Sequence, residues 1–295
     1  MERSAGILLA ISSLPSKYGI GSFSKEAYRF VDWLRAAHQS YWQILPMGPT
    51  GYGDSPYQSF STFAGNPYFI DLDTLVDQGL LTDRECRERD WGDDGRYVDY
   101  RTIYEGRYPI LRKSYERWKM TDSMEFSLFM DENKEWIYDY SLFMAVKDSL
   151  GGIPWTEWPQ DIRNRQPDAV QKMQVELAEE IHFQQYMQYL FYTQWNALKS
   201  YANKNHIRII GDIPIYVAMD SADVWAHPEL FRLDEDRCPY EVAGCPPDGF
   251  SETGQLWGNP LYNWEHHKET GYAWWMQRLA ACFERYDVVR IDHFR

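Results

Sequence analysis

The chain has 295 residues, enough for one large domain or two small ones. Its formal net charge of −14 argues against nucleic acid or an anionic membrane as a partner, because an acidic surface is repelled by both. A mean hydropathy of −0.59 with 44% hydrophobic residues is typical of a soluble globular protein. Aromatic residues make up 17% of the chain, so we expect some of them to form stacking surfaces for a ligand as well as core.

The cysteines and the first residues bear on metal binding and location. The chain has four cysteines: Cys86, Cys238, Cys245 and Cys282. None has CxxC spacing, so we predict no metal site, no redox site and no cofactor. Reduced thiols are the usual state in the cytoplasm, and we expect a cytoplasmic protein. Residues 5–11 are apolar, but the run is short and has no positively charged leader, so it is interpreted as a strand and not as a signal peptide.

The first 45 residues predict a strand, a helix and a second strand. Residues 6–11 are an apolar run that predicts the first strand. Residues 24–37 have apolar side chains at helical spacing, and Ser24 is a suitable N-cap. Residues 41–45 form the second predicted strand, which Pro46 ends.

A long insertion follows the second predicted strand. It opens with a loop rich in turn residues at 48–58, and residues 84–182 have the charge and scattered aromatics of a mostly helical insertion. Apolar periodicity then predicts a helix over 183–202 and a third strand over 206–212.

The rest of the chain repeats this order. Residues 213–271 form a second insertion, rich in Gly, Pro and Trp. A helix is predicted over 272–283. The apolar residues Val288, Val289 and Ile291 then predict a short buried strand at the end of the chain.

That final strand carries a charged pair. Arg290 and Asp292 are two residues apart, so on a strand both point to the same face. We expect the guanidinium to keep the carboxylate ionised, as a nucleophile in sugar chemistry requires. A purely structural ion pair remains the alternative. Asp212 repeats the pattern, since it too stands at the carboxyl end of an apolar strand.

The order of elements predicts an α/β fold. Strands alternate with helices, helix-to-strand connections are short, and both long insertions follow strands. This is the pattern of a (β/α)8 TIM barrel, in which long strand-to-helix loops build the active face. Only about the first four strands are present, so we interpret residues 1–295 as the N-terminal part of a single catalytic barrel. A doubly wound open sheet remains the alternative.

Several stretches together resemble one enzyme family. They are residues 12–15 (SSLP), 18–21 (YGIG), 53–58 (GDSPYQ), 64–68 (AGNPY), 211–217 (GDIPIYV), 246–260 (PPDGFSETGQLWGNP) and 290–295 (RIDHFR). With them the chain resembles the N-terminal portion of glycoside hydrolase family 77, the 4-α-glucanotransferases, also called amylomaltases or disproportionating enzymes. The stretches are long and spread over the whole chain.

The resemblance implies a retaining transglycosylase that moves α-1,4-glucan segments from a maltodextrin donor to an acceptor, which is glucose or an oligosaccharide. Asp292 is the implied nucleophile, forming a covalent glycosyl-Asp intermediate. The implied substrate-binding residues are Arg290, His293, Asp212, Tyr57, Ser55, Phe250, Trp257 and Tyr52. The family also requires a glutamate acid/base and a second aspartate on later strands, beyond Arg295, so we expect this fragment alone to be inactive.

Other interpretations of these residues stay open. Phe250 and Trp257 could pack their loop, Asp212 could stabilise a strand end, and His293 could be a packed imidazole. An α-amylase-type hydrolase and a non-catalytic glucan-binding fragment are the alternative functions.

Overall fold

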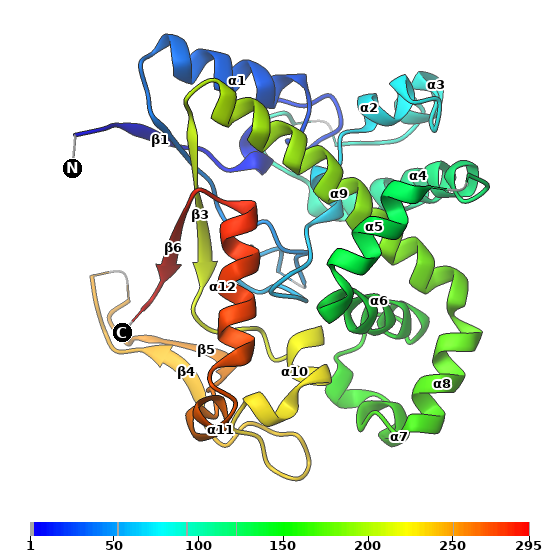
Figure 1. Ribbon diagram of the computed structural model, residues 1–295, viewed down its shortest axis with the longest axis vertical. Helices are drawn as coiled ribbons and strands as arrows, with labels where there is room; N and C mark the ends of the chain where they lie inside the picture. Colours follow the sequence, from blue (N-terminus) through cyan, green and yellow to red (C-terminus); the bar gives the residue numbers. More distant parts are fainter. Residues whose placement is uncertain (1–2, 52, 93, 122, 250, 295) are drawn as a thin grey trace.

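The computed structural model describes residues 3–51, 53–92, 94–121, 123–249 and 251–294. Four strands form a parallel sheet in the order β1-β2-β3-β6, which lies toward one side of the molecule (Figure 1). The strands are β1 (Gly6–Leu8), β2 (Tyr41–Gln43), β3 (Arg208–Pro214) and β6 (Val288–Asp292). All four predicted strands therefore form, and each lies beside the next one predicted along the chain. The α/β class is confirmed.

Three helices pack on this sheet. They are α1 (Lys25–Ala36), α9 (Ala178–Lys204) and α12 (Ala273–Arg285). Helix α1 packs against α9, α9 against β3, and α12 against β6. The predicted cap is confirmed, because the Ser24 side chain accepts a hydrogen bond from the Glu26 amide. Helix α9 begins five residues before the predicted start at 183, so its first turn lies within the predicted insertion 84–182.

The segment between β2 and β3 is mostly helical and lies to one side of the sheet (Figure 1). Its α-helices before α9 are α2 (Leu72–Asp77), α3 (Asp83–Arg87), α4 (Tyr100–Trp118), α5 (Met124–Glu132), α6 (Lys134–Ser149), α7 (Gln160–Arg163) and α8 (Pro167–Glu176). Short 3-10 turns cover Ile11–Ser13, Pro67–Phe69, Trp155–Glu157 and Pro228–Leu230.

The segment between β3 and α12 contains an antiparallel hairpin that was not predicted. The hairpin consists of β4 (Val242–Cys245) and β5 (Gln255–Pro260). Helix α10 (Ala222–Ala226) precedes it and helix α11 (Trp264–Glu269) follows it. Strands β4 and β5 pair only with each other among the described residues. In Figure 1 the hairpin lies beyond the end of β6, near the carboxyl terminus.

Helix α9 separates two apolar cores. One, with Trp42, Phe191 and Trp195, fills the space between the sheet and helices α1, α4 and α9. The other joins the helical insertion to the segment after β3, and Tyr189 and Tyr192 of α9 pack against both. The helix is therefore the shared wall of the structure.

Two buried glutamines of α9 hold the loop that follows β2. Gln188 accepts from the Gly65 amide at 2.7 Å and donates to the Gly65 carbonyl at 2.9 Å. Gln194 makes the same pair of hydrogen bonds with Asp71, at 2.6 and 3.2 Å. Each side-chain amide thus makes the two backbone hydrogen bonds that a neighbouring strand would make in a sheet. Without them the buried backbone N–H and C=O groups would be unpaired, which would destabilise the fold. Gly65 also lies so close to Phe191 that an added Cβ would sit 2.2 Å from the ring.

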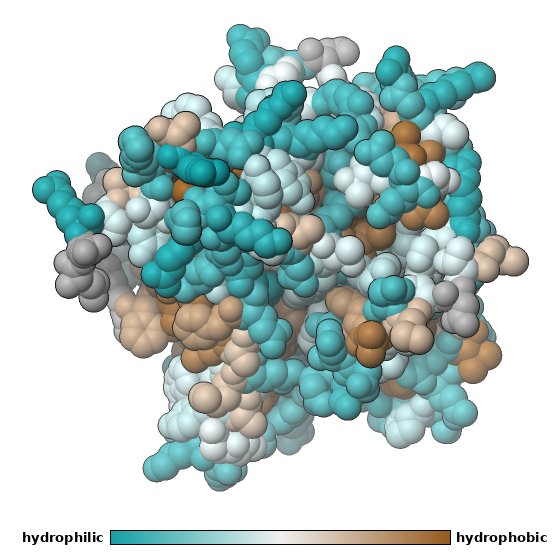
Figure 2. Space-filling view, turned by 45° about the horizontal axis from the view of Figure 1, so that its top comes forward, coloured by the Kyte–Doolittle hydropathy of each residue, from teal (hydrophilic) through white to brown (hydrophobic). Residues whose placement is uncertain are grey.

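The surface of the molecule is mostly polar on the face drawn in Figure 2, with separate hydrophobic areas. None of the helices in the described ranges combines the length and apolar character needed to cross a membrane.

The prediction of a buried final strand is wrong. Most residues of β6 are partly exposed and Arg290 is exposed. The reason is position: β6 is an edge strand, paired only with β3 among the described residues.

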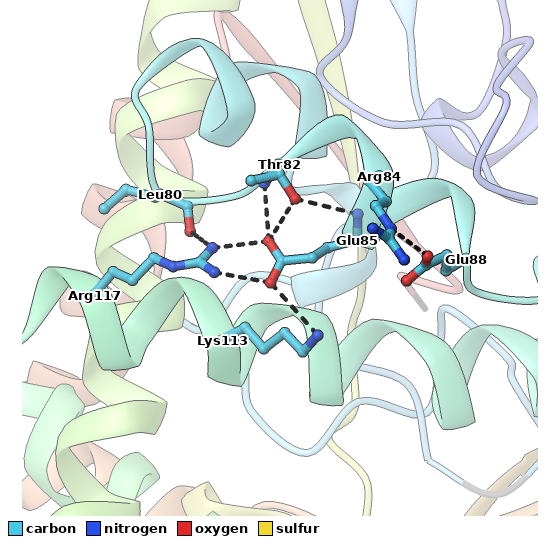
Figure 3. Close-up of polar contacts among 7 residues, drawn as sticks. All are labelled: Leu80, Thr82, Arg84, Glu85, Glu88, Lys113 and Arg117. Atoms are coloured by element: carbon cyan, nitrogen blue, oxygen red, sulfur yellow. Dashed lines mark hydrogen bonds and ion pairs between the residues drawn. The ribbon is translucent and has the colours of Figure 1, made fainter.

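Glu85 joins α3 to α4 through several polar contacts (Figure 3). Its carboxylate accepts two hydrogen bonds from Arg117, at 2.8 and 2.9 Å, and two from Thr82 in a capping box. The side chain is 18% exposed. The hydrogen bonds from Arg117 hold the pKa of Glu85 well below its ordinary value.

We predict that Glu85→Gln lowers the free energy of unfolding at pH 7 by about 1–3 kcal/mol, because it breaks charge-assisted hydrogen bonds. A depressed pKa stabilises the fold above the unfolded-state value of about 4.3 and ceases to do so as the pH falls through the folded-state value. The difference between variant and wild type should therefore shrink below about pH 4. Urea denaturation at pH 7 and pH 3 measures it.

The matched control is Glu88→Gln. Glu88 pairs with Arg84 in the same view but is 59% exposed, so its loss should change stability by less than about 0.5 kcal/mol (Figure 3). Equal effects of the two substitutions at pH 7 would show that Glu85 has no special role.

Candidate functional site

The carboxyl ends of β3 and β6 bring three charged side chains together. The parallel register places Arg290 beside Asp212 and Asp292 beside Pro214. Arg290 donates from Nη1 to Asp212 Oδ1 at 2.6 Å and from Nη2 to Asp292 Oδ1 at 2.5 Å. The predicted Arg290–Asp292 pair forms, and the same guanidinium also binds the second strand-end aspartate.

Asp212 is the buried member of this group, with 1% of its side chain exposed. Its second oxygen, Oδ2, accepts a hydrogen bond from the Tyr57 hydroxyl at 2.8 Å. Both oxygens are thus engaged, which offsets the cost of burying a carboxylate. The hydrogen bond to Asp212 is the main cause that raises the pKa of Arg290. The neighbouring Gly211 allows close packing, because a Cβ there would lie 2.2 Å from the Tyr286 ring.

Tyr57 reaches Asp212 from the loop after β2. A turn sets its direction: the Ser55 hydroxyl accepts from the Tyr57 amide at 3.3 Å, and the Ser55 carbonyl from the Gln58 amide at 3.1 Å. Burial, followed by the hydrogen bond to Asp212, raises the pKa of Tyr57. The phenol therefore stays protonated and acts as the donor in this contact.

A cleft of about 420 Å³ opens beside these groups. Its lining residues are Ser55, Tyr57, Gln58, Pro214, Ile215, Tyr216, Gln255, Trp257, Asn259, Arg290, Asp292 and His293. Six of the predicted site residues therefore meet here: Ser55, Tyr57, Trp257, Arg290, Asp292 and His293. Asp212 does not line this cleft and lies behind Arg290 and Tyr57. Tyr52 and Phe250 fall outside the described residues.

Trp257 and His293 form the aromatic side of the cleft. Their ring centroids are 4.5 Å apart, and Trp257 donates from Nε1 to Gln255 Oε1 at 3.0 Å. His293 has a left-handed backbone, with φ of 53°, a conformation that costs energy for a residue with a Cβ. Its Nε2 lies 3.4 Å from Asp292 Oδ2. The hairpin thus carries an aromatic ring to the nucleophile candidate at the end of β6.

Four polar or aromatic residues of the cleft were missed by sequence reasoning. They are Gln58, Tyr216, Gln255 and Asn259. All four belong to the stretches that carry the family resemblance, and that was the available signal. Their chemistry, amides beside aromatic rings, suits a ligand with many hydroxyl groups and apolar ring faces. Within the described ranges, no group of three or more His, Cys, Asp or Glu side chains could hold a metal ion.

We predict that Tyr57→Phe lowers the free energy of unfolding by about 1–3 kcal/mol, because buried Asp212 loses a hydrogen-bond donor. The matched control is Tyr216→Phe, which removes the hydroxyl of another cleft tyrosine for which the described residues supply no hydrogen-bond partner. Urea denaturation measures the free energy of unfolding of both variants. A decrease for Tyr216→Phe as large as that for Tyr57→Phe would contradict the role given to Asp212.

The chain is similar to known proteins over nearly its whole length. A model of the family described as 4-alpha-glucanotransferase matches residues 9–295. The 4-alpha-glucanotransferase of Clostridium butyricum is 50% identical over 286 residues, which cover 97% of this chain and 59% of that protein. The Thermus thermophilus 4-alpha-glucanotransferase is 48% identical over 299 residues, covering 100% of this chain and 59% of that protein.

A solved structure shows the same relationship. The amylomaltase from Streptococcus agalactiae, in complex with acarbose, matches with a TM-score of 0.96 and 44% identity over 99% of this chain and 60% of that chain. The chain spans about 59% of the length of the curated relatives named above. The resemblance seen in the sequence is confirmed, and the chain belongs to glycoside hydrolase family 77, the 4-alpha-glucanotransferases.

Proposed function

We propose that this chain supplies the nucleophile and part of the glucan cleft of a retaining 4-α-glucanotransferase. The observation that carries the proposal is Asp292, which opens on the cleft while hydrogen-bonded to Arg290. Family membership supports the reaction class. A relative solved in complex with acarbose supports an α-glucan-like ligand in this cleft. Maltodextrin is the proposed donor, and glucose or a maltodextrin the proposed acceptor.

The mechanism follows from the geometry of a nucleophilic carboxylate. Asp292 attacks the anomeric carbon of the donor, and its bond to carbon forms as the bond to the leaving oxygen breaks. An acid elsewhere in a protein of full family length protonates that oxygen. A hydroxyl of the acceptor glucan then attacks the glycosyl ester, loses its proton to the same group and restores the free carboxylate.

Arg290 and the aromatic rings have separate parts in this scheme. Arg290 holds the Asp292 carboxylate in place by a charge-assisted hydrogen bond to Oδ1. Trp257 offers a flat face for a sugar ring and narrows the access of water. Reduced access of water favours transfer to an acceptor hydroxyl over hydrolysis, which distinguishes this reaction from that of an α-amylase.

We also propose that the sheet is the first half of a (β/α)8 barrel, with residues 84–182 and 213–271 as insertions in it. Two features support this. Strand β6 is a partly exposed edge, and Met276 and Phe283 of α12 are 64% and 59% exposed. A further strand and helix would cover them, and the greater length of the relatives could supply both. The cytoplasmic location stays a prediction.

The covalent intermediate provides the test. We predict that a slow fluorinated glucosyl donor, added to the enzyme of full family length, labels Asp292, and that peptide mass spectrometry finds the label between Arg290 and Arg295. Asp292→Asn keeps the shape of the side chain but cannot form the ester, so turnover should fall by several orders of magnitude. Maltodextrin binding should change little.

Two outcomes would sink the assignment: label on Asp212, or near-normal turnover by Asp292→Asn. The chain of 295 residues by itself should produce no glucose from maltotriose, because Asp292 is the one carboxyl group among the described residues that line the cleft and a retaining mechanism needs two.

A further inference from the structure

Asn259 lies at the end of the hairpin strand β5 and is 4% exposed. Its Nδ2 donates to the Val217 carbonyl at 2.7 Å. A backbone carbonyl can only accept, so this contact determines which way the amide faces. With Nδ2 directed at Val217, the oxygen Oδ1 is necessarily directed to the other side.

Gln58 stands on that other side. Its Nε2 donates to Asn259 Oδ1 at 3.1 Å. The orientation of one amide therefore determines the orientation of the next, because Oδ1 accepts and cannot donate. The Gln58 amide is left with its oxygen Oε1, to which the described residues donate no hydrogen bond. Both Gln58 and Asn259 line the cleft that contains Asp292.

We propose that Asn259 is a positioning residue that orients Gln58 so that Oε1 accepts a hydrogen bond from one sugar hydroxyl in the cleft. The inference rests on the proposed function for the class of ligand. It adds a chemical preference to that function: at this point the cleft recognises a donor group, and a sugar that carries hydrogen in place of that hydroxyl leaves Oε1 unpaired.

The three residues joined by these two hydrogen bonds lie on different segments of the chain. Val217 follows β3, Gln58 belongs to the loop after β2, and Asn259 comes from the hairpin. One buried side chain thus joins the three segments that form this part of the cleft. A glutamine without such a partner could present either its oxygen or its nitrogen to a ligand, and would not discriminate between a donor and an acceptor.

The test uses methyl maltoside and its monodeoxy derivatives, in which each hydroxyl in turn is replaced by hydrogen. Calorimetric titration measures their binding to the enzyme of full family length, because this chain supplies only part of the proposed glucan cleft. We expect wild type to bind at least one derivative about 3- to 10-fold more weakly than the parent sugar, the effect of one neutral hydrogen bond. In Gln58→Met one such position should show no loss. In Asn259→Leu the loss at that same position should fall below about twofold.

The matched control is Gln255→Met, the same substitution at another cleft glutamine whose Oε1 already accepts from Trp257. It should keep the discrimination at the Gln58 position. Circular dichroism checks that the variants fold. If Asn259→Leu does not fold, Gln58→Met still tests whether the Gln58 amide recognises the sugar hydroxyl, because the Gln58 side chain is only partly buried.

The possible outcomes distinguish failure of the proposed function from failure of the role given to Asn259 and Gln58. Binding of none of these sugars by wild type would contradict the proposed function, and the inference with it. Wild-type binding with a pattern of preference that Gln58→Met or a folded Asn259→Leu leaves unchanged would overturn this inference alone. The same applies if Asn259→Leu weakens every sugar equally, because a merely structural role would have that effect.

Discussion

The site depends on one guanidinium shared by two carboxylates. Arg290 hydrogen-bonds Asp212 on one side and Asp292 on the other, and only Asp212 is fully buried. Asp212 also binds Tyr57, so a carboxylate outside the cleft determines where two of its lining residues lie. A buried carboxylate with all its partners is stable, whereas the loss of one partner leaves a desolvated group unpaired. The arrangement therefore resists displacement of Tyr57 or Arg290, and Asp292 remains available to a ligand.

The larger structure serves to bring distant segments to this point. The buried glutamines of α9 hold the loop after β2 by paired backbone hydrogen bonds, and that loop carries Tyr57. The hairpin brings Trp257 to the end of β6. Buried amides thus recur where irregular backbone must be fixed, because an amide can satisfy a donor and an acceptor at once. Rigid positioning of this kind is what a reaction with a short-lived intermediate requires.

Local patterns predicted much of the fold, and long-range contacts explain what was missed. Apolar runs located all four strands, and Ser24 marked the first helix, because these signals lie within a few residues. The spacing of Arg290 and Asp292 predicted their pairing for the same reason. The contact between Asp212 and Arg290 depends on strand register across 78 residues, which no local pattern encodes. The β4–β5 hairpin and the link between Gln58 and Asn259 depend equally on tertiary packing.

The most direct test of this account is a crystal structure of Asp212→Ala compared with that of the wild-type chain. The account predicts that the Arg290 guanidinium and the Tyr57 ring both leave their wild-type positions, while the backbones of β3 and β6 keep their register. Asp292 should then lose its hydrogen bond from Arg290. If Arg290 and Tyr57 kept their places without the Asp212 carboxylate, the site would be held by packing alone, and the central role of Asp212 would be contradicted.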